Sequence, residues 1–132
     1  MMGGCLCQRV RYRVRATPIY AGHCHCRDCQ RATGAGHVTA VGINKTDLEI
    51  TGALASFSSL GGSGKEVRRF FCPNCSSMIY SESDAGPGVI SLSAGTLDDP
   101  SAISPQFALF ERDRPSWDET SQSILHHYTV PA

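Results

Sequence analysis

The sequence predicts a mostly β fold in a single domain, and three observations lead to that prediction. The chain has 132 residues, the length of one ordinary domain, and 41% of them are hydrophobic against 18% charged. Short segments that alternate hydrophobic and polar residues are separated by clusters of Gly, Pro, Asn and Asp. No window shows the hydrophobic period of a long amphipathic helix.

The segment that begins near residue 10 is the clearest strand, because Val10, Tyr12 and Val14 alternate with three arginines. The predicted strands cover 10–15, 37–43, 48–51, 54–58, 66–71, 78–81, 89–94 and 107–110, and a single helical turn is predicted at 27–33. Arg68 and Arg69 follow one another in a predicted strand, so at most one of them points to any given face. No repeat or linker divides the chain, and the predicted domain is 1–132.

Charge and hydropathy exclude several classes of protein. Twelve basic and twelve acidic side chains give a formal net charge of zero, so neither nucleic acid nor an anionic membrane is an expected partner. No apolar run approaches the roughly 20 residues of a membrane-spanning helix. The first residues, Met-Met-Gly-Gly-Cys, lack the basic head and apolar stretch of a secretory signal, so a cytoplasmic location is expected.

Cysteine is the unusual feature of the composition, with seven in a short chain. A reducing cytosol keeps thiols unpaired, and an odd count leaves one over in any case. The cysteines fall in three tight groups: Cys5 and Cys7; Cys24, Cys26 and Cys29; Cys72 and Cys75. Such short spacings let neighbouring thiolates converge on one metal ion, and zinc is the predicted metal. An iron–sulfur cluster is the main alternative, because thiolates hold it too.

Metal stoichiometry suggests how the seven cysteines divide. A structural zinc site takes four protein ligands and a catalytic site three, so the count divides as four plus three. In one division Cys5, Cys7, Cys72 and Cys75 form the closed site, and Cys24, Cys26 and Cys29 form the open site. In the other, the pairs at 26–29 and 72–75 combine as in a zinc ribbon and leave Cys5, Cys7 and Cys24. Residues 30–71 make a longer gap than the usual ~15–20 of that pattern, which mildly disfavours it, but spacing alone leaves both open.

The three groups occur in the order Cys-x-Cys, Cys-x-Cys-x-x-Cys and Phe-Cys-x-x-Cys, and their surroundings carry further motifs. The middle group runs on through Gln30-Arg31, the last is followed by Gly95-Thr96-Leu97-Asp98-Asp99-Pro100, and Arg114-Pro115-Ser116-Trp117 comes near the end. Together these motifs resemble the glutathione-dependent formaldehyde-activating enzyme family, which also includes centromere protein V. The resemblance covers about 3–118.

The resemblance implies the first division of the cysteines. Residues that match Cys5, Cys7, Cys72 and Cys75 hold a structural zinc in the family, and those that match Cys24, Cys26 and Cys29 hold the catalytic zinc. It also implies a zinc-stapled arrangement of antiparallel sheets called a β-tent. The founding activity joins glutathione and formaldehyde to S-hydroxymethylglutathione and is formally that of a carbon–sulfur lyase. The expected partners are therefore a small thiol such as glutathione and a small aldehyde.

A zinc ion held by three thiolates suits this chemistry. Its exchangeable position could bind a substrate thiol and lower the pKa of that thiol, so that a thiolate attacks the aldehyde. Three thiolates weaken the Lewis acidity of the metal, which favours thiol delivery over carbonyl activation. His23, His25, Arg27 and Asp28 flank the ligands and are candidates for orienting them or moving a proton. For His25 and Asp28 the simpler interpretation is that they point to solvent.

Three positions depart from the family pattern. Gln8 and Ser76 stand where glycine is common, a residue that tolerates positive φ. Ala108 stands where the family often has a histidine or glutamate. Near the end of the chain, His126 and His127 are expected in an exposed tail.

A non-catalytic, zinc-stabilised binding or scaffold module is the alternative function. A scaffold is expected to saturate both zinc ions with four protein ligands, which would require a histidine such as His23 or His25 at the second site. An open fourth position beside Cys24, Cys26 and Cys29 would favour an enzyme.

Overall fold

Strands are the main regular secondary structure in this computed structural model, which describes residues 1–131. Ala132, the last residue of the predicted domain 1–132, lies outside the described residues. The strands are β1 (Met2–Gly4), β2 (Arg11–Val14), β3 (Tyr20–Cys24), β4 (Val38–Asn44), β5 (Leu48–Thr51), β6 (Ala55–Leu60), β7 (Glu66–Phe71), β8 (Met78–Ser83), β9 (Val89–Ser93), β10 (Phe107–Leu109) and β11 (Leu125–His126). The α-helix is α1 (Arg27–Thr33), and short 3₁₀ turns are η1 (Lys45–Asp47), η2 (Ala94–Thr96), η3 (Pro100–Ala102) and η4 (Glu111–Asp113). None of the helices within 1–131 has the length and apolar character needed to cross a membrane.

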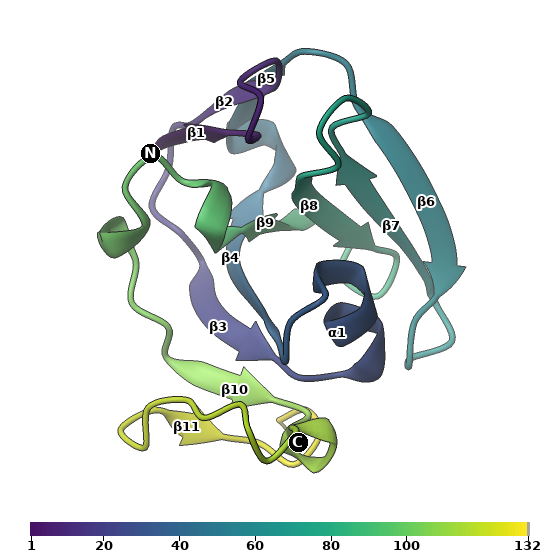
Figure 1. Ribbon diagram of the computed structural model, residues 1–132, viewed down its shortest axis with the longest axis vertical. Helices are drawn as coiled ribbons and strands as arrows, with labels where there is room; N and C mark the ends of the chain where they lie inside the picture. The colour runs from purple at the N-terminus through teal and green to yellow at the C-terminus, as the bar shows by residue number, and fades with distance from the viewer. Residues whose placement is uncertain (132) are drawn as a thin grey trace.

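The strands form two sheets in one domain (Figure 1). The smaller sheet has the order β1-β2-β5, and the larger has the order β11-β10-β3-β4-β9-β8-β7-β6. Neighbouring strands are antiparallel except for β10, which runs parallel to both β3 and β11. The mostly β prediction is confirmed, and the larger sheet is mixed at this edge. In Figure 1 the smaller sheet lies at the top, β10 and β11 run along the bottom, and α1 lies between the two ends of the larger sheet.

The core lies where the smaller sheet packs against the middle of the larger one. Val10, Tyr12 and Val14 are 0%, 4% and 4% exposed, as their alternation predicts. Ile90 and Leu92 of β9 are fully buried and join the same cluster. The hydrophobic face of β2 therefore covers the centre of the larger sheet.

Predicted and observed elements agree best where the sequence pattern is regular. The helical turn at 27–33 and the strands at 48–51 and 66–71 have the predicted bounds. Strand β3, however, has no counterpart in the sequence analysis, because Tyr-Ala-Gly-His-Cys is short and has no hydrophobic alternation. Its backbone is held instead by β4 on one side and β10 on the other.

Gly22 in β3 makes room for an aromatic ring. A Cβ atom at this position would lie 2.3 Å from the ring of Phe107, which sits opposite Gly22 in β10. A side chain here would displace that ring. The absence of a side chain at Gly22 thus lets the Phe107 ring pack against the strand that ends at Cys24.

Two turns that carry cysteines contain a residue other than glycine at positive φ. Gln8 has φ 68° and Ser76 has φ 67°, which confirms that both positions demand the left-handed region. Their backbone N–H groups close the turns on the carbonyl oxygens of Cys5 and Cys72, at 3.1 and 2.8 Å. The Gln8 side chain also donates to the carbonyl of Cys5 and accepts from Arg11, at 3.1 and 2.9 Å. Those two bonds offset part of the conformational cost of Gln8.

The exposed side chain of Ser76 makes no hydrogen bond among residues 1–131, so replacing it by glycine should stabilise the protein. Removing the Cβ atom relieves the strain of the left-handed conformation in the folded state, which is worth about 1–2 kcal/mol. Glycine also raises the conformational entropy of the unfolded chain, which lowers stability by less, about 0.5–1 kcal/mol. Ser76→Gly should therefore raise the free energy of unfolding by about 0.5–1 kcal/mol, measured by urea unfolding at fixed zinc concentration. Ser76→Ala is the control and should bring no such gain. A destabilising Ser76→Gly would contradict this account of the turn.

Candidate active site

The sulfur atoms of the seven cysteines form two separate clusters. One contains Cys5, Cys7, Cys72 and Cys75, the other contains Cys24, Cys26 and Cys29, and within each cluster the Sγ atoms lie within 4.8 Å of one another. All seven cysteines are free thiols. This is the four-plus-three grouping of the first division, and the zinc-ribbon grouping does not occur.

The four-cysteine cluster has the spacing of a closed metal site. Cys5 and Cys7 lie in the turn between β1 and β2, and Cys72 and Cys75 lie in the turn between β7 and β8. The Sγ atoms of Cys5 and Cys7 are 3.5 Å apart, and those of Cys7 and Cys72 are 3.8 Å apart. A tetrahedral zinc ion bound at about 2.3 Å separates its sulfur ligands by about 3.8 Å. The cluster could therefore hold a tetrahedral metal ion without rearrangement.

This cluster joins the two sheets. The backbone N–H of Leu6 donates across the junction to Ser77 Oγ at 3.1 Å, and the N–H of Val10 donates to Cys5 Sγ at 3.2 Å. Hydrogen bonds from the side chain and backbone of Ser77 lower the pKa of Cys75 to about 5. Donors aimed at sulfur favour the thiolate form that binds a metal ion.

The three-cysteine cluster is built where β3 runs into α1. Cys24 ends β3, Cys26 is the N-cap of α1, and the backbone N–H of Cys29 donates to Cys26 Sγ at 3.3 Å. Residues three apart in the first turn of a helix lie on the same side, which brings Cys26 and Cys29 together. Hydrogen bonds from Cys24 and Cys29 lower the pKa of Cys26 to about 2, and hydrogen bonding with Cys26 raises the pKa of Cys24. These hydrogen bonds favour the thiolate form at Cys26.

The histidines beside the three cysteines have other partners. His23 Nδ1 lies 2.8 Å from Thr39 Oγ1, and His25 Nδ1 lies 3.1 Å from the carbonyl oxygen of Gly36. No His, Asp or Glu side chain within residues 1–131 joins the three-cysteine cluster as a fourth ligand. His25 is fully buried, so the interpretation that it points to solvent is wrong, whereas Asp28 is exposed.

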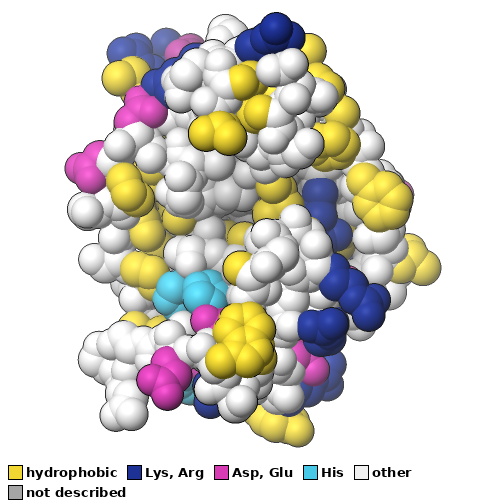
Figure 2. Space-filling model, viewed as in Figure 1, with side chains coloured by type: hydrophobic (Ala, Val, Ile, Leu, Met, Phe, Trp, Pro, Cys, Tyr) yellow, Lys and Arg dark blue, Asp and Glu magenta, His cyan; other side chains and the backbone are white. Residues whose placement is uncertain are grey.

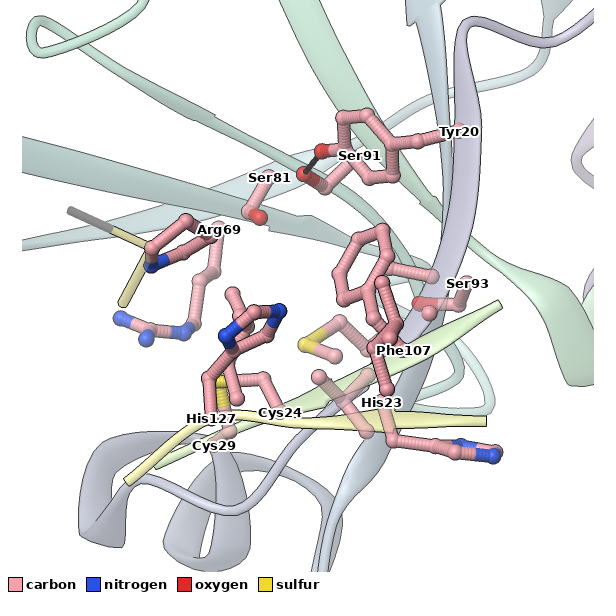
Figure 3. A pocket seen from close by; sticks show the side chains of 17 residues that line it. Tyr20, His23, Cys24, Cys29, Arg69, Ser81, Ser91, Ser93, Phe107 and His127 are labelled. Atoms are coloured by element: carbon pink, nitrogen blue, oxygen red, sulfur yellow. Dashed lines mark hydrogen bonds between the residues drawn. The ribbon is translucent and has the colours of Figure 1, made fainter. Parts of the chain in front are cut away.

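A cavity of about 670 Å³ adjoins the three-cysteine cluster. Its lining includes Tyr20, Gly22, His23, Cys24, Cys29, Val38, Arg69, Met78, Phe107, Leu109, Leu125, His127 and Pro131. In Figure 3 Arg69 and His127 lie on one side of the cavity and Tyr20 and Phe107 on the other, with Cys24 and Cys29 beside His127. Most of the lining is apolar, which is typical of a small-molecule site.

Arg69 gives the cavity its positive charge. It points into the cavity, whereas Arg68 pairs with Glu82 and Asp84 at 3.4 and 2.9 Å, which confirms that the two arginines face opposite ways. Hydrogen bonding with Cys24 lowers the pKa of Cys29, but hydrogen bonding with Cys26 and burial outweigh it and raise this pKa to about 11; the Arg69 guanidinium adds a smaller lowering. Arg69 Nη1 donates to Ser59 Oγ at 3.4 Å, but no ion pair found among residues 1–131 includes Arg69, so no carboxylate neutralises its charge at the cavity.

A group of three histidines, of which His25 is fully buried and His23 and His37 are partly exposed, supports the cysteine segment. Asp118 Oδ2 lies 2.7 Å from His37 Nδ1 and 3.2 Å from His25 Nδ1, and the rings of His23 and His37 are 4.6 Å apart. Figure 2 shows histidine side chains reaching the surface as one group on this face. Burial, and then the charges of His37 and His25, lower the pKa of His23 to about 4, which keeps its imidazole neutral at neutral pH. His23 and His25 were candidates from their positions beside the cysteines, but their grouping with His37 and Asp118 could not be predicted, because Asp118 lies far along the chain.

The segment after β10 corrects one expectation. His126 is exposed, as expected, but the segment is not a free tail: β11 pairs with β10, His126 Nδ1 contacts Glu111 Oε1 at 2.5 Å, and His127 is partly buried and lines the cavity. The backbone N–H of His127 donates to the carbonyl of Ala108 at 2.9 Å. Ala108 is fully buried between two residues that line the cavity, so its side chain faces away from the cavity.

Comparison with known proteins gives the family. Residues 1–113 match the family described as glutathione-dependent formaldehyde-activating enzyme. The chain belongs to this family. The crystal structure of a Rhodobacter sphaeroides protein, a structural-genomics target, has a similar fold, with a TM-score of 0.60 and 21% identity over 80% of this chain and 92% of that one. No curated protein is similar enough to this chain to count as a match.

The two cysteine clusters should respond differently to substitution. Cys72→Ser removes a ligand from the site that joins the sheets, so it should prevent stable folding, because structural zinc contributes about 10–16 kcal/mol to small metal-dependent folds. Cys26→Ser should leave a folded protein with about one zinc ion fewer. The measurements are zinc per chain by elemental analysis and folding by circular dichroism. Identical behaviour of the two variants would contradict the division into two sites.

Proposed function

We propose that this protein is a zinc-dependent enzyme of the carbon–sulfur lyase type, which forms or cleaves a thiol–aldehyde adduct such as S-hydroxymethylglutathione. The observation that carries the proposal is the three-cysteine cluster, which has no fourth protein ligand within residues 1–131 and adjoins a cavity of about 670 Å³. Membership of the glutathione-dependent formaldehyde-activating family supports the same chemistry.

The proposal assigns one zinc ion to each cysteine cluster. Cys5, Cys7, Cys72 and Cys75 would hold the structural ion, and Cys24, Cys26 and Cys29 the catalytic one. Thiolate donors at short spacing suit zinc, and a site with three protein ligands leaves one position for substrate. A zinc ion bound there would supply a position for the substrate sulfur and keep that sulfur as a thiolate at neutral pH.

Cleavage of the thiol–aldehyde adduct needs a group that accepts one proton, and this chain supplies such a group. The hydroxyl proton of the adduct leaves, the carbon–oxygen bond becomes a double bond, and the carbon–sulfur bond breaks to give a free aldehyde and a thiolate. His127 lines the cavity, and its imidazole can accept the hydroxyl proton at a ring nitrogen.

His127→Gln tests that role. A general base typically contributes about 10²-fold or more, so kcat for adduct cleavage should fall by about 10²-fold while zinc content stays constant. The measurements are steady-state kinetics and elemental analysis on the same preparation. An unchanged kcat would assign proton transfer to another group.

The reaction itself is tested by NMR exchange spectroscopy on a panel of thiols and aldehydes that begins with glutathione and formaldehyde. The zinc-loaded protein should exchange free aldehyde with adduct faster than the spontaneous reaction. Cys26→Ser should abolish the acceleration, whereas Arg68→Gln, on the opposite face of β7, should retain it. No acceleration with any pair of the panel would contradict the proposal.

A zinc-stabilised scaffold is the second candidate. It would be favoured if both metal ions proved to have four protein ligands. No ring nitrogen of His23 or His25 joins the three-cysteine cluster, which argues against either of them as the fourth ligand.

A further inference from the structure

The cavity beside the three cysteines is lined mainly by apolar side chains and contains one fixed positive charge. Among its lining residues Arg69 is the one lysine or arginine, and none is an aspartate or glutamate. The rest of the lining is dominated by side chains such as Phe107, Leu109, Val38 and Met78. Such a cavity binds an apolar body best and can pair with one anionic group.

The charged groups of glutathione do not match those of the cavity lining. At neutral pH it carries two carboxylates and an ammonium group, so a complementary cavity needs more than one cation and at least one carboxylate. Ser81, Ser91 and Ser93 also line the cavity and offer hydroxyl groups, but with Arg69 as its one fixed cation the cavity leaves one carboxylate and the ammonium without an ionic partner. The hydroxymethyl group from formaldehyde, in turn, is too small to cover the apolar wall in a cavity of about 670 Å³.

One wall of the cavity comes from a part of the chain outside the family match. Leu125, His127 and Pro131 line the cavity, whereas the match ends at residue 113. Backbone hydrogen bonds hold this segment in place: the N–H of Phe110 donates to the carbonyl of Thr129 at 2.8 Å, and that of Leu125 to Gln106 at 3.1 Å. The wall is therefore built into the fold, and it adds apolar surface.

We propose that the preferred substrate is a thiol–aldehyde adduct with an apolar, aryl-sized body and a single carboxylate, bound with the carboxylate on Arg69 and the body against Phe107 and Leu125. This inference rests on the proposed function and narrows its substrate. The reaction is the same: the hydroxyl proton leaves, the aldehyde carbonyl forms, and the carbon–sulfur bond breaks to release the thiolate.

Binding of thioethers that cannot react tests the substrate class without turnover. The zinc-loaded protein should bind 3-(benzylthio)propionate at least tenfold more tightly than S-methylglutathione in calorimetric titration. It should also prefer 3-(benzylthio)propionate over the methyl ester of that acid by at least tenfold. Tighter binding of S-methylglutathione, or equal binding of acid and ester, overturns the inference.

Substitutions at β7 test the role of Arg69. Arg69→Gln should bring the preference for acid over ester to near one, and Arg69→Lys, which keeps the charge, should retain most of it. Arg68→Gln is the matched control and should bind like the unaltered protein, because Arg68 faces Glu82 and Asp84. Retention of the full preference by Arg69→Gln, folded as judged by circular dichroism, overturns the assignment of the carboxylate to Arg69.

The rates at which free aldehyde exchanges with adduct distinguish a wrong substrate class from a wrong reaction type. The pair 3-mercaptopropionate and benzaldehyde should be accelerated more strongly than glutathione and formaldehyde. The reverse order overturns the substrate class and leaves the lyase proposal standing. No acceleration with either of these pairs or with the rest of the panel overturns the lyase proposal itself.

Discussion

The junction at Cys5, Cys7, Cys72 and Cys75 is the constraint on which the arrangement of the two sheets depends. Cys7 and Cys72 are 65 positions apart in the chain, yet their sulfur atoms are 3.8 Å apart. Four uncoordinated thiols at this spacing bring little stability by themselves, whereas a shared metal ion binds them strongly. The strain in the two turns, with Gln8 and Ser76 in the left-handed region, is tolerated because each turn must direct its two sulfur atoms to one point.

The second cluster depends on a different kind of support. Cys24 ends a strand that is paired on both sides, and Cys26 and Cys29 begin the helix that follows it. The buried contacts of His25 with Gly36 and Asp118 hold the backbone between the first two cysteines. The strand and the helix hold these three cysteines in place without a fourth protein ligand. The fourth coordination position of a metal ion bound there can therefore face the cavity.

The sequence predicted the fold class and the local groups of cysteines, but not how the strands and turns meet in space. Cysteine spacing is local, so the three groups and the resemblance they carry could be read directly from the chain. The grouping into four and three depends on which turns meet in space, and the spacing left two divisions open. Strand β3 was missed because Ala21 and Gly22 give no hydrophobic alternation, and its pairing with β10 joins residues far apart in sequence. The cavity was missed for the same reason: Arg69, Phe107 and His127 meet only after the sheet has formed.

The central claim is that the fold divides seven cysteines into a closed and an open zinc site. Anomalous diffraction at the zinc absorption edge, on crystals of the purified protein, tests it most directly. We expect two peaks, one about 2.3 Å from each of the four sulfur atoms of Cys5, Cys7, Cys72 and Cys75, and one at the same distance from those of Cys24, Cys26 and Cys29. The second ion should have a fourth ligand that is not a protein side chain. A single peak, a signal from iron in place of zinc, or a protein side chain as fourth ligand at the second site would contradict the account.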